Sequence, residues 1–449
     1  MTEPTMLIWH RNDLRVQSHA ALAYAADKPY RIVGSFFDVP GQWRAHGHGD
    51  RKIKLYRRAA SELQQAYQQA GLEFHLQQAD SFDQSIRELT ALLERLKPVE
   101  LALHAEYELN EYRRDCQVAD ICRQKGIKLR IFHDQIMINP EQIRTQSDQP
   151  FKVYTPFMKR WRSLLDNPQQ LSPIVSTSVT PMAHSLEQQA HARLQRFTSA
   201  GIDGYTQGRD FYARSATAEI SVALSIGLLS SRQCHIAALA SRRDHNAEAV
   251  EKWRNELVWR EFYKYISYHF PHICQGRSFR AEYDALVWNH QPQWLRAWKD
   301  GQTGYPAVDA AQRCLVATGF MPNRLRMVSA MFLSKDLGID WREGERWFIQ
   351  QLEDGDFSAN NGGWQWSAST GVDAAPYFRI FNPIEQSRKF DPDGGFIRAW
   401  VPELARLNQK DIHWPTTAQR AGCGYPEPVV DHKQAREQTM TRFKVLKRP

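Results

Sequence analysis

Short apolar runs alternate with helical patterns over the first 135 residues of the chain. In the helical stretches, residues 53–70 and 82–96 among them, apolar side chains recur at the spacing of an amphipathic helix. The apolar runs predict strands at Met6–Trp9, Arg31–Phe37, Glu73–Leu76, Glu100–His104 and Lys128–Phe132. This alternation predicts a Rossmann-like α/β domain with an open, mostly parallel sheet. No G-x-G-x-x-G motif follows the first strand, so a dinucleotide site is not expected there.

The pattern changes after residue 135. A linker is predicted over residues 136–195, because Leu171–His184 is rich in Ser, Thr and Pro and lacks periodicity. Within it, the aromatic and basic segment Phe151–Trp161 is expected to pack on a domain. Later residues show only helical patterns, separated by Gly, Pro and Asn clusters. We therefore predict an α/β domain over residues 1–135 and an all-α domain over residues 196–449.

The net charge of +8 lies in the later part of the chain. Residues 1–150 hold 20 Lys/Arg and 20 Asp/Glu, and the whole chain holds 58 and 50, which leaves 38 and 30 for residues 151–449. A basic region favours a polyanionic partner, nucleic acid first, although on charge alone a soluble basic enzyme fits equally well.

The six cysteines form no C-x-x-C pair, which disfavours a zinc ribbon, a redox motif or an iron–sulfur cluster, and no metal site is expected. No apolar stretch approaches the length of a membrane span, and the first residues lack the features of a secretory signal. We expect a cytoplasmic protein with no membrane partner.

Two helical segments carry candidate chemistry. In NELVWREFY, Glu256, Trp259 and Arg260 lie at i, i+3 and i+4 and share one helix face. In isolation, such a set also fits a surface ion pair beside a core tryptophan. In TGFMPNRLRM, Asn323 and Met327 lie one turn apart on one face.

Two further segments follow. Asp354 and Asp356 flank a glycine near a predicted helix end, where they could bind a ligand, pair with an arginine or cap a turn. Ser358–Pro383 is predicted to be a long, ordered, aromatic loop in which Asn and Gly let the backbone approach a flat ligand. Trp364 and Trp366 lie in this segment.

Together these segments resemble the DNA photolyase/cryptochrome family, most closely the bacterial class I cyclobutane pyrimidine dimer photolyases of the folate-antenna type. The resemblance covers nearly the whole chain and includes IWHRNDLRVQSHAAL (8–22), TGYPAVDAAQR (303–313) and ANNGGWQWSASTGVDAAPYFRIFNP (359–383). It implies an N-terminal antenna domain and a C-terminal helical domain that binds FAD and DNA. The implied activity is light-dependent repair of pyrimidine dimers by a monomer associated with the nucleoid.

The resemblance also implies the residues that hold FAD. Those expected at the phosphates are Tyr205, Arg209, Thr217 and Ser221. Those expected at the isoalloxazine, ribose and adenine are Asn323, Arg326, Asp354, Asp356 and Asn360, with Arg326 paired to Asp354 and Asn360 facing flavin N5. The chain departs from the family at Ala218-Glu219 in the phosphate segment and at Phe320 and Pro322.

The implied substrate and electron-transfer residues come from the same segments. The dimer pocket is expected to use Glu256, Trp259, Asn323, Met327 and Trp366, with Glu256 stabilising the charge that develops on the dimer. Phosphate contacts are expected from Arg260, Arg324 and Arg379. Trp364, Trp341 and Trp288 match the family's tryptophan chain from flavin to surface, although on composition alone three core aromatics would be favoured.

The implied antenna is 5,10-methenyltetrahydrofolate, bound by His46, Asn110, Glu111 and Cys274, with 8-hydroxydeazaflavin as the competing identity. Two other functions are weighed against repair of cyclobutane dimers. A signalling cryptochrome is disfavoured by Asn360 and by the short segment after Pro383. A (6-4) photoproduct enzyme needs a histidine in the pocket, where this chain has Asn323 and Met327.

Overall fold

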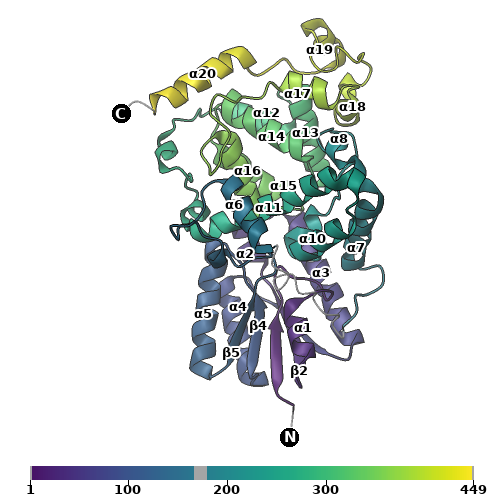
Figure 1. The fold of residues 1–449 in the computed structure, drawn as a ribbon. Coiled ribbons are helices and arrows are strands. Elements are labelled where there is room, and N and C mark those ends of the chain that lie inside the picture. Colours follow the sequence, from purple (N-terminus) through teal and green to yellow (C-terminus); the bar gives the residue numbers. More distant parts are fainter. Residues whose placement is uncertain (1–2, 166–178, 447–449) are drawn as a thin grey trace. The chain divides into compact units, whose positions relative to one another are not determined.

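The structure is a computed structural model that describes residues 3–165 and 179–446 (Figure 1). Contacts divide the chain into two compact units. Unit 1 comprises residues 1–206 and 217–271, and unit 2 comprises residues 207–216 and 272–449. The contacts thus group several helices after residue 195 with the sheet, whereas the three-part division expected from the sequence remains a prediction. Most of the linker's Ser-, Thr- and Pro-rich stretch lies outside the described residues.

Unit 1 is built on a five-stranded parallel sheet in the order β3-β2-β1-β4-β5, which confirms the predicted fold. The strands are β1 Thr5–Trp9, β2 Arg31–Asp38, β3 Glu73–Gln78, β4 Glu100–His104 and β5 Lys128–Phe132. Every residue of β1 and β4 is buried, because both strands have neighbours on either side and helices on the sheet faces. Figure 1 shows α4 and α5 on one side of this sheet.

The helices of unit 1 follow the predicted alternation and then continue into an all-helical part. They are α1 Ala20–Ala26, α2 Pro40–Ala45, α3 Asp50–Gln69, α4 Phe82–Leu96, α5 Leu109–Lys125, η1 Pro140–Gln142, α6 Tyr154–Leu165, α7 Leu186–Arg196, η3 Phe197–Gly201, η4 Ile202–Gly204, α8 Tyr205–Gly208, α9 Ser221–Ile226, α10 Ser231–Ala240, η5 Asp244–Asn246 and α11 Ala247–His269. Helix α8 runs across the boundary between the two units.

The aromatic segment expected to pack on a domain forms most of α6, which packs on α11. Its buried residues, Tyr154, Phe157, Trp161 and Leu165, recur at helical spacing and form one apolar face. The indole of Trp161 donates a hydrogen bond to Glu261 Oε2 at 2.6 Å, so a buried polar contact also joins the two helices.

Unit 2 contains only helices and irregular segments among its described residues, as predicted. Its elements are η6 Pro271–Gln275, η7 Ala281–Ala285, α12 Pro292–Asp300, α13 Pro306–Thr318, α14 Asn323–Met331, η8 Phe332–Asp336, α15 Trp341–Gln351, α16 Phe357–Ala368, α17 Pro383–Phe390, α18 Gly395–Trp400, η9 Pro402–Leu404, α19 Thr417–Cys423 and α20 His432–Val445. Helices α13, α14, α15 and α16 supply much of a core that includes Trp298, Trp341 and Trp364. In the described parts of the chain, no helix is long and apolar enough to cross a membrane.

One predicted element is wrong. The segment expected to be a loop from Ser358 to Pro383 begins inside helix α16. Asp356 caps this helix by accepting a hydrogen bond from the Ala359 amide at 3.0 Å. Asn and Gly have low helix propensity, but packing of Trp364 in the core of unit 2 outweighs it. Only the part after Ala368 is irregular.

Candidate functional site

A cavity opens in unit 1 at the carboxyl ends of the central strands. In a doubly wound sheet, this edge is where ligands bind. Its wall is largely aromatic, and Trp43 stacks on Tyr56 with ring centroids 4.5 Å apart and an interplanar angle of 12°. The lining residues are Trp9, Arg11, Asn12, Phe36, Phe37, Val39, Trp43, His46, His48, Tyr56, Phe82, Ser85, Glu106, Glu111 and Arg114.

Three of the predicted antenna residues meet at this cavity. His46 ends α2, whereas Asn110 and Glu111 lie in the first turn of α5. Asn110 Nδ2 lies 3.0 Å from His46 Nε2, and His46 Nδ1 lies 3.4 Å from Glu111 Oε1. The Asn110-Glu111 dipeptide and a distant histidine therefore form one polar cluster beside the aromatic wall.

Burial makes this cluster electrically neutral near pH 7. Burial, aided by the negative charges of Glu108 and Glu106, raises the pKa of Glu111 to about 8. Burial also lowers the pKa of His46. Glu111 therefore keeps its proton at neutral pH and has an O–H to donate, whereas His46 is an uncharged imidazole. The fourth predicted antenna residue, Cys274, belongs to η6 in unit 2.

Helix α11 presents the predicted substrate residues of unit 1. Glu256, Trp259 and Arg260 all lie on this helix and are partly buried, as their spacing predicts. The Trp259 ring is stacked on Tyr154 of α6 with centroids 3.6 Å apart and an interplanar angle of 2°. Sequence reasoning missed Tyr154, although its place in the Phe151–Trp161 segment was a usable signal.

Arg260, predicted to contact phosphate, is hydrogen-bonded within unit 1. Its guanidinium donates to the backbone carbonyl of Gln135, to Ser231 Oγ at 3.2 Å and to the Leu224 carbonyl at 3.2 Å. Arg260 therefore ties α11 to α9, to the first residue of α10 and to the chain after β5.

The predicted flavin-phosphate residues are divided between the units. Tyr205, Thr217 and Ser221 belong to unit 1, and Arg209 belongs to unit 2. Tyr205 is buried against Phe197 with ring centroids 5.8 Å apart, whereas Thr217 and the first residue of α9, Ser221, are exposed. In the departure at residues 218–219, Glu219 adopts a left-handed backbone with φ 51°, a conformation that costs energy for a side chain of this type.

Unit 2 confirms one predicted pair. Arg326 Nη2 lies 2.8 Å from Asp354 Oδ2, and the Asp354 side chain is only 4% exposed. Asp354 follows the end of α15, as the sequence predicts, and Asp356 caps the next helix. Asn360 lies on α16 and donates from Nδ2 to the Glu345 carbonyl at 3.0 Å.

The other arginines of unit 2 differ in their surroundings. Arg324 forms an ion pair with Asp210 at 2.8 Å and lies over the ring of Phe390. Arg379 is exposed. Asn323 and Met327 lie one turn apart on α14, as predicted, and Trp366 is partly buried on α16.

The three tryptophans of the predicted chain all belong to unit 2. Trp341 and Trp364 are buried, and Trp288 is partly exposed, which agrees with an inner-to-outer order. The nearest aromatic neighbours of the Trp364 ring include Phe348 at 4.9 Å and Trp298 at 6.0 Å between centroids. Trp298 was not singled out from the sequence because nothing in its local pattern distinguishes it from a core residue.

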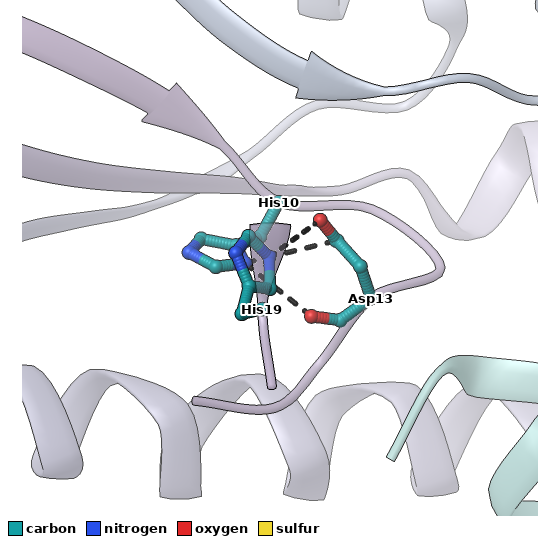
Figure 2. Close-up of side chains that lie close together, drawn as sticks. All are labelled: His10, Asp13 and His19. Carbon is teal, nitrogen blue, oxygen red and sulfur yellow. Dashed lines mark hydrogen bonds and ion pairs between the residues drawn. The ribbon is translucent and has the colours of Figure 1, made fainter. Parts of the chain in front are cut away.

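A second polar cluster lies just after β1. Figure 2 shows His10 and His19 side by side, with Asp13 facing both imidazoles from one side. His19 Nε2 lies 2.9 Å from Asp13 Oδ2, and His10 Nδ1 lies 3.7 Å from Asp13 Oδ1. His104, at the end of β4, brings its Nδ1 within 3.0 Å of Asp13 Oδ2. By distance alone, the three residues of Figure 2 could hold a metal ion.

The hydrogen bonds favour protons over a metal in this cluster. His19 Nδ1 accepts from the Leu22 amide at 3.2 Å and caps α1, so the proton of its neutral ring is on Nε2. A nitrogen that carries a proton cannot ligate a metal and instead donates to Asp13. Burial lowers the pKa of His19 well below its usual range. Burial alone would raise the pKa of the Asp13 carboxyl, but the neighbouring His10 and His104 lower it well below its usual range. The cluster therefore fixes the loop between β1 and α1.

Family comparisons match both halves of the chain. The family model described as DNA photolyase matches residues 6–174. The model described as the FAD binding domain of DNA photolyase matches residues 253–445.

Curated relatives match over the full length. The chain is 39% identical to the deoxyribodipyrimidine photo-lyase of Salmonella typhimurium and 39% identical to that of Escherichia coli, with 99% of each chain covered in both cases.

Solved structures agree. A bacterial class III photolyase from Agrobacterium tumefaciens has a TM-score of 0.87 at 30% identity and covers 100% of this chain and 98% of its own. A cryptochrome from Synechocystis has a TM-score of 0.86 at 26% identity, covering 98% of this chain and 99% of its own. An archaeal photolyase from Sulfolobus tokodaii with two FAD molecules has a TM-score of 0.78 at 26% identity. The match covers 98% of this chain and 100% of the archaeal chain.

Proposed function

Because this chain belongs to the DNA photolyase family, we propose that it is a deoxyribodipyrimidine photo-lyase that uses light to repair cyclobutane pyrimidine dimers in DNA. The observation that carries this proposal is the 39% identity to enzymes of that name over 99% of both chains. The basic charge of residues 151–449 supports a DNA substrate, because phosphate contacts supply much of the affinity for nucleic acid.

The cofactor is FAD, which the match to an FAD binding domain supports. The buried Arg326–Asp354 pair offers paired donors and acceptors on unit 2, and the exposed hydroxyls of Thr217 and Ser221 suit phosphate oxygens. The proposed set is Tyr205, Arg209, Thr217, Ser221, Asn323, Arg326, Asp354, Asp356 and Asn360. When bound and reduced, FAD supplies the excited-state electron that opens the cyclobutane ring and is then returned, so no net redox change occurs.

The protein's own part is to hold the lesion and stabilise its charge. Glu256 is proposed to hydrogen-bond the pyrimidine edge and to stabilise the negative charge that develops there. Trp259 and Trp366 are proposed as apolar walls, with Asn323 and Met327 completing the pocket. Arg260, Arg324 and Arg379 are proposed as phosphate contacts, and the Arg260 guanidinium also donates hydrogen bonds inside unit 1.

Electron supply from the surface is proposed to pass along Trp288, Trp341 and Trp364. Trp288 is partly exposed whereas Trp341 and Trp364 are buried, which supports Trp288 as the outer end. This route restores the reduced state of the protein and takes no part in the repair cycle itself.

The cavity of unit 1 is proposed to hold the antenna, 5,10-methenyltetrahydrofolate. Its stacked aromatic wall suits a flat heterocycle, and the neutral Glu111 and the Asn110 amide suit the hydrogen-bonding edge of a pterin. Cys274 is retained in the proposed set. An absorption spectrum of the purified protein tests this identity, since a folate, a deazaflavin and a second flavin absorb at different wavelengths.

The test of repair uses an oligonucleotide that carries one thymine dimer. The dimer is expected to disappear under blue light and to persist in the dark. Persistence under light, with FAD bound and reduced, would contradict repair and favour a cryptochrome, the other function found among the structural relatives. The Glu256→Ala variant should lower repair per absorbed photon more than it weakens binding, because the carboxyl acts mainly on the charged dimer.

A further inference from the structure

The Tyr154 side chain covers one face of Trp259, the indole proposed as a wall of the dimer pocket. The two rings are parallel within 2°, and their centroids are 3.6 Å apart, which is van der Waals contact. An indole has two faces, so at most one face of Trp259 is open to a base. From this contact we infer that Tyr154 is a positioning residue that orients Trp259 for the lesion. The inference rests on the proposed function.

The alignment of the two rings is imposed by the helices that carry them. Aromatic quadrupoles prefer offset or edge-to-face arrangements over a direct face-to-face sandwich. The pairing is instead held by hydrogen bonds between α6 and α11. Tyr154 Oη donates to the Asn255 carbonyl at 3.2 Å, Arg162 Nη2 donates to Asn255 Oδ1 at 2.9 Å, and Trp161 donates to the buried Glu261.

Neighbouring rings limit the indole further. Phe262 contacts Trp259 nearly at right angles, with centroids 5.9 Å apart, and Tyr263 lies at 5.7 Å with a tilt of 34°. Phe262 also meets Tyr154 edge-on at 5.7 Å. Because Tyr154 covers one face of the Trp259 indole and Phe262 and Tyr263 lie beside it, Trp259 has little freedom to rotate about its side-chain bonds.

This rigidity bears on selectivity. A dimer must leave the base stack to enter the pocket, which costs a few kcal/mol and less for a damaged pair. Because the Trp259 indole is already oriented, it loses no rotamer freedom when the dimer binds. More of the contact energy then offsets the cost of flipping the dimer out of the base stack. Undamaged DNA does not reach the wall and gains nothing from its orientation. Tyr154 therefore raises the preference for dimer-containing DNA without raising affinity for DNA in general.

The measurement is binding in the dark, by the holoprotein, of two duplexes that differ only in one thymine dimer. Tyr154→Leu is expected to lower the ratio of the two affinities about three- to tenfold, as loss of an aromatic pair implies, while affinity for undamaged DNA stays constant. Tyr154→Phe keeps the ring and the Arg162 and Trp161 hydrogen bonds between α6 and α11, so it should keep the ratio within about twofold. If the leucine variant does not fold, Tyr154→Met provides a flexible side chain of similar volume.

A matched control separates orientation from packing. Phe157 lies one turn along α6 in the same aromatic cluster, with Phe262 at 5.0 Å and Tyr265 at 4.9 Å. Phe157→Leu should lower thermal stability about as much as Tyr154→Leu and leave the affinity ratio unchanged. In a Trp259→Ala background, Tyr154→Leu should have no further effect on the ratio.

Several outcomes would overturn the inference. An unchanged ratio in Tyr154→Leu would reduce Tyr154 to a core residue. An equal fall in Phe157→Leu, or a further fall in the Trp259→Ala background, would show that Tyr154 does not act through the Trp259 ring. A wild-type protein without a preference for the dimer would contradict the proposed function and remove the inference with it, whereas a preference that survives Tyr154→Leu contradicts the inference alone.

Discussion

Glu111 at the cavity of unit 1 and Asp354 in unit 2 are two largely buried carboxylates with opposite electrostatic surroundings. At the cavity, Glu111 lies among other carboxylates, and burial raises its pKa to about 8, so the group is neutral at pH 7. In unit 2, the buried carboxylate of Asp354 is paired with Arg326 at 2.8 Å. The Glu111 carboxyl can therefore change charge within an accessible pH range, whereas the Asp354 carboxylate has a guanidinium as its partner.

This difference fits the two tasks proposed above for the cavity of unit 1 and the helices of unit 2. A light-harvesting site needs shape and hydrogen bonds for a neutral heterocycle and makes no demand on charge. A site that supports electron transfer needs a constant electrostatic potential, because a shift in nearby charge changes the energy of the reduced cofactor. The contrast predicts that the two regions respond differently to pH, to substitution and to light of different wavelengths.

The largest effect is expected when the fixed pair of unit 2 is broken. Asp354→Asn leaves the Arg326 guanidinium without its counter-charge, and because that side chain is 26% exposed, we expect a loss of about 2–3 kcal/mol in the free energy of unfolding. FAD content should fall as well. Chemical denaturation and the flavin absorbance of the purified protein measure the two effects.

Glu385→Gln is the control for that variant. It breaks an exposed pair with Arg388, in which the side chains are 62% and 47% exposed, and should cost under about 0.5 kcal/mol. Equal effects of the two substitutions would show that burial of the Arg326–Asp354 pair is irrelevant.

The next effect concerns Glu111 and pH. Its folded-state pKa of about 8 exceeds its ordinary value of 4.5, so its contribution to stability is fully present below pH 4.5 and is lost as the pH rises through 8. Glu111→Gln removes this loss and should raise the free energy of unfolding at pH 8 relative to wild type. At pH 4.5 the two proteins should differ little.

Denaturation curves across this pH range measure the Glu111 effect. Glu94→Gln, at a side chain that is 63% exposed, serves as the control and should leave the pH profile unchanged. A Glu111→Gln profile parallel to that of wild type would mean that Glu111 is already ionised at neutral pH.

The contrast between the regions also shows what the sequence could and could not reveal. The sheet was predictable because β1 and β4 are continuous apolar runs, and the Arg326–Asp354 pair followed from a long motif. Helix α16 was not predictable, because its Asn and Gly residues disfavour a helix. The helix is stabilised by the burial of Trp364 in the core of unit 2. The internal hydrogen bonds of Arg260 were not predictable either, because periodicity gives a helix face without saying what that face meets.

Two other features depend on contacts that the sequence does not record. The raised pKa of Glu111 depends on Glu106 and Glu108, and their proximity and burial require coordinates. The stacking of Tyr154 on Trp259 joins residues more than 100 positions apart in the chain, which no periodic pattern records.

A smaller effect, confined to electron supply, is expected at Trp288. Trp288→Phe keeps an aromatic ring but removes the more easily oxidised indole, so light-driven reduction of the oxidised protein should slow at least about tenfold. Repair after chemical reduction should stay normal. Trp294→Phe, in the same core but outside the proposed chain, is the control and should photoreduce normally. Unimpaired photoreduction in Trp288→Phe would point to another route, and Trp298 beside Trp364 is the first candidate.

The smallest effect is expected at Arg324, because Asp210 already pairs with it at 2.8 Å. Arg324→Ala should weaken binding severalfold and reduce the slope of log affinity against log salt by about 0.9, the value for one phosphate contact. Binding titrations over a range of salt concentrations give the slope. An unchanged slope would remove Arg324 from the phosphate contacts.

The most direct test of the division between the two regions is the action spectrum of dimer repair. It is measured for wild type and for Glu111→Ala, both with reduced FAD and a thymine-dimer oligonucleotide. The variant should lose the contribution of the antenna band and retain that of the flavin, with the same repair per photon absorbed by flavin. Identical spectra for two proteins that both repair, from a wild type shown to contain its antenna, would contradict the assignment of light harvesting to the unit 1 cavity.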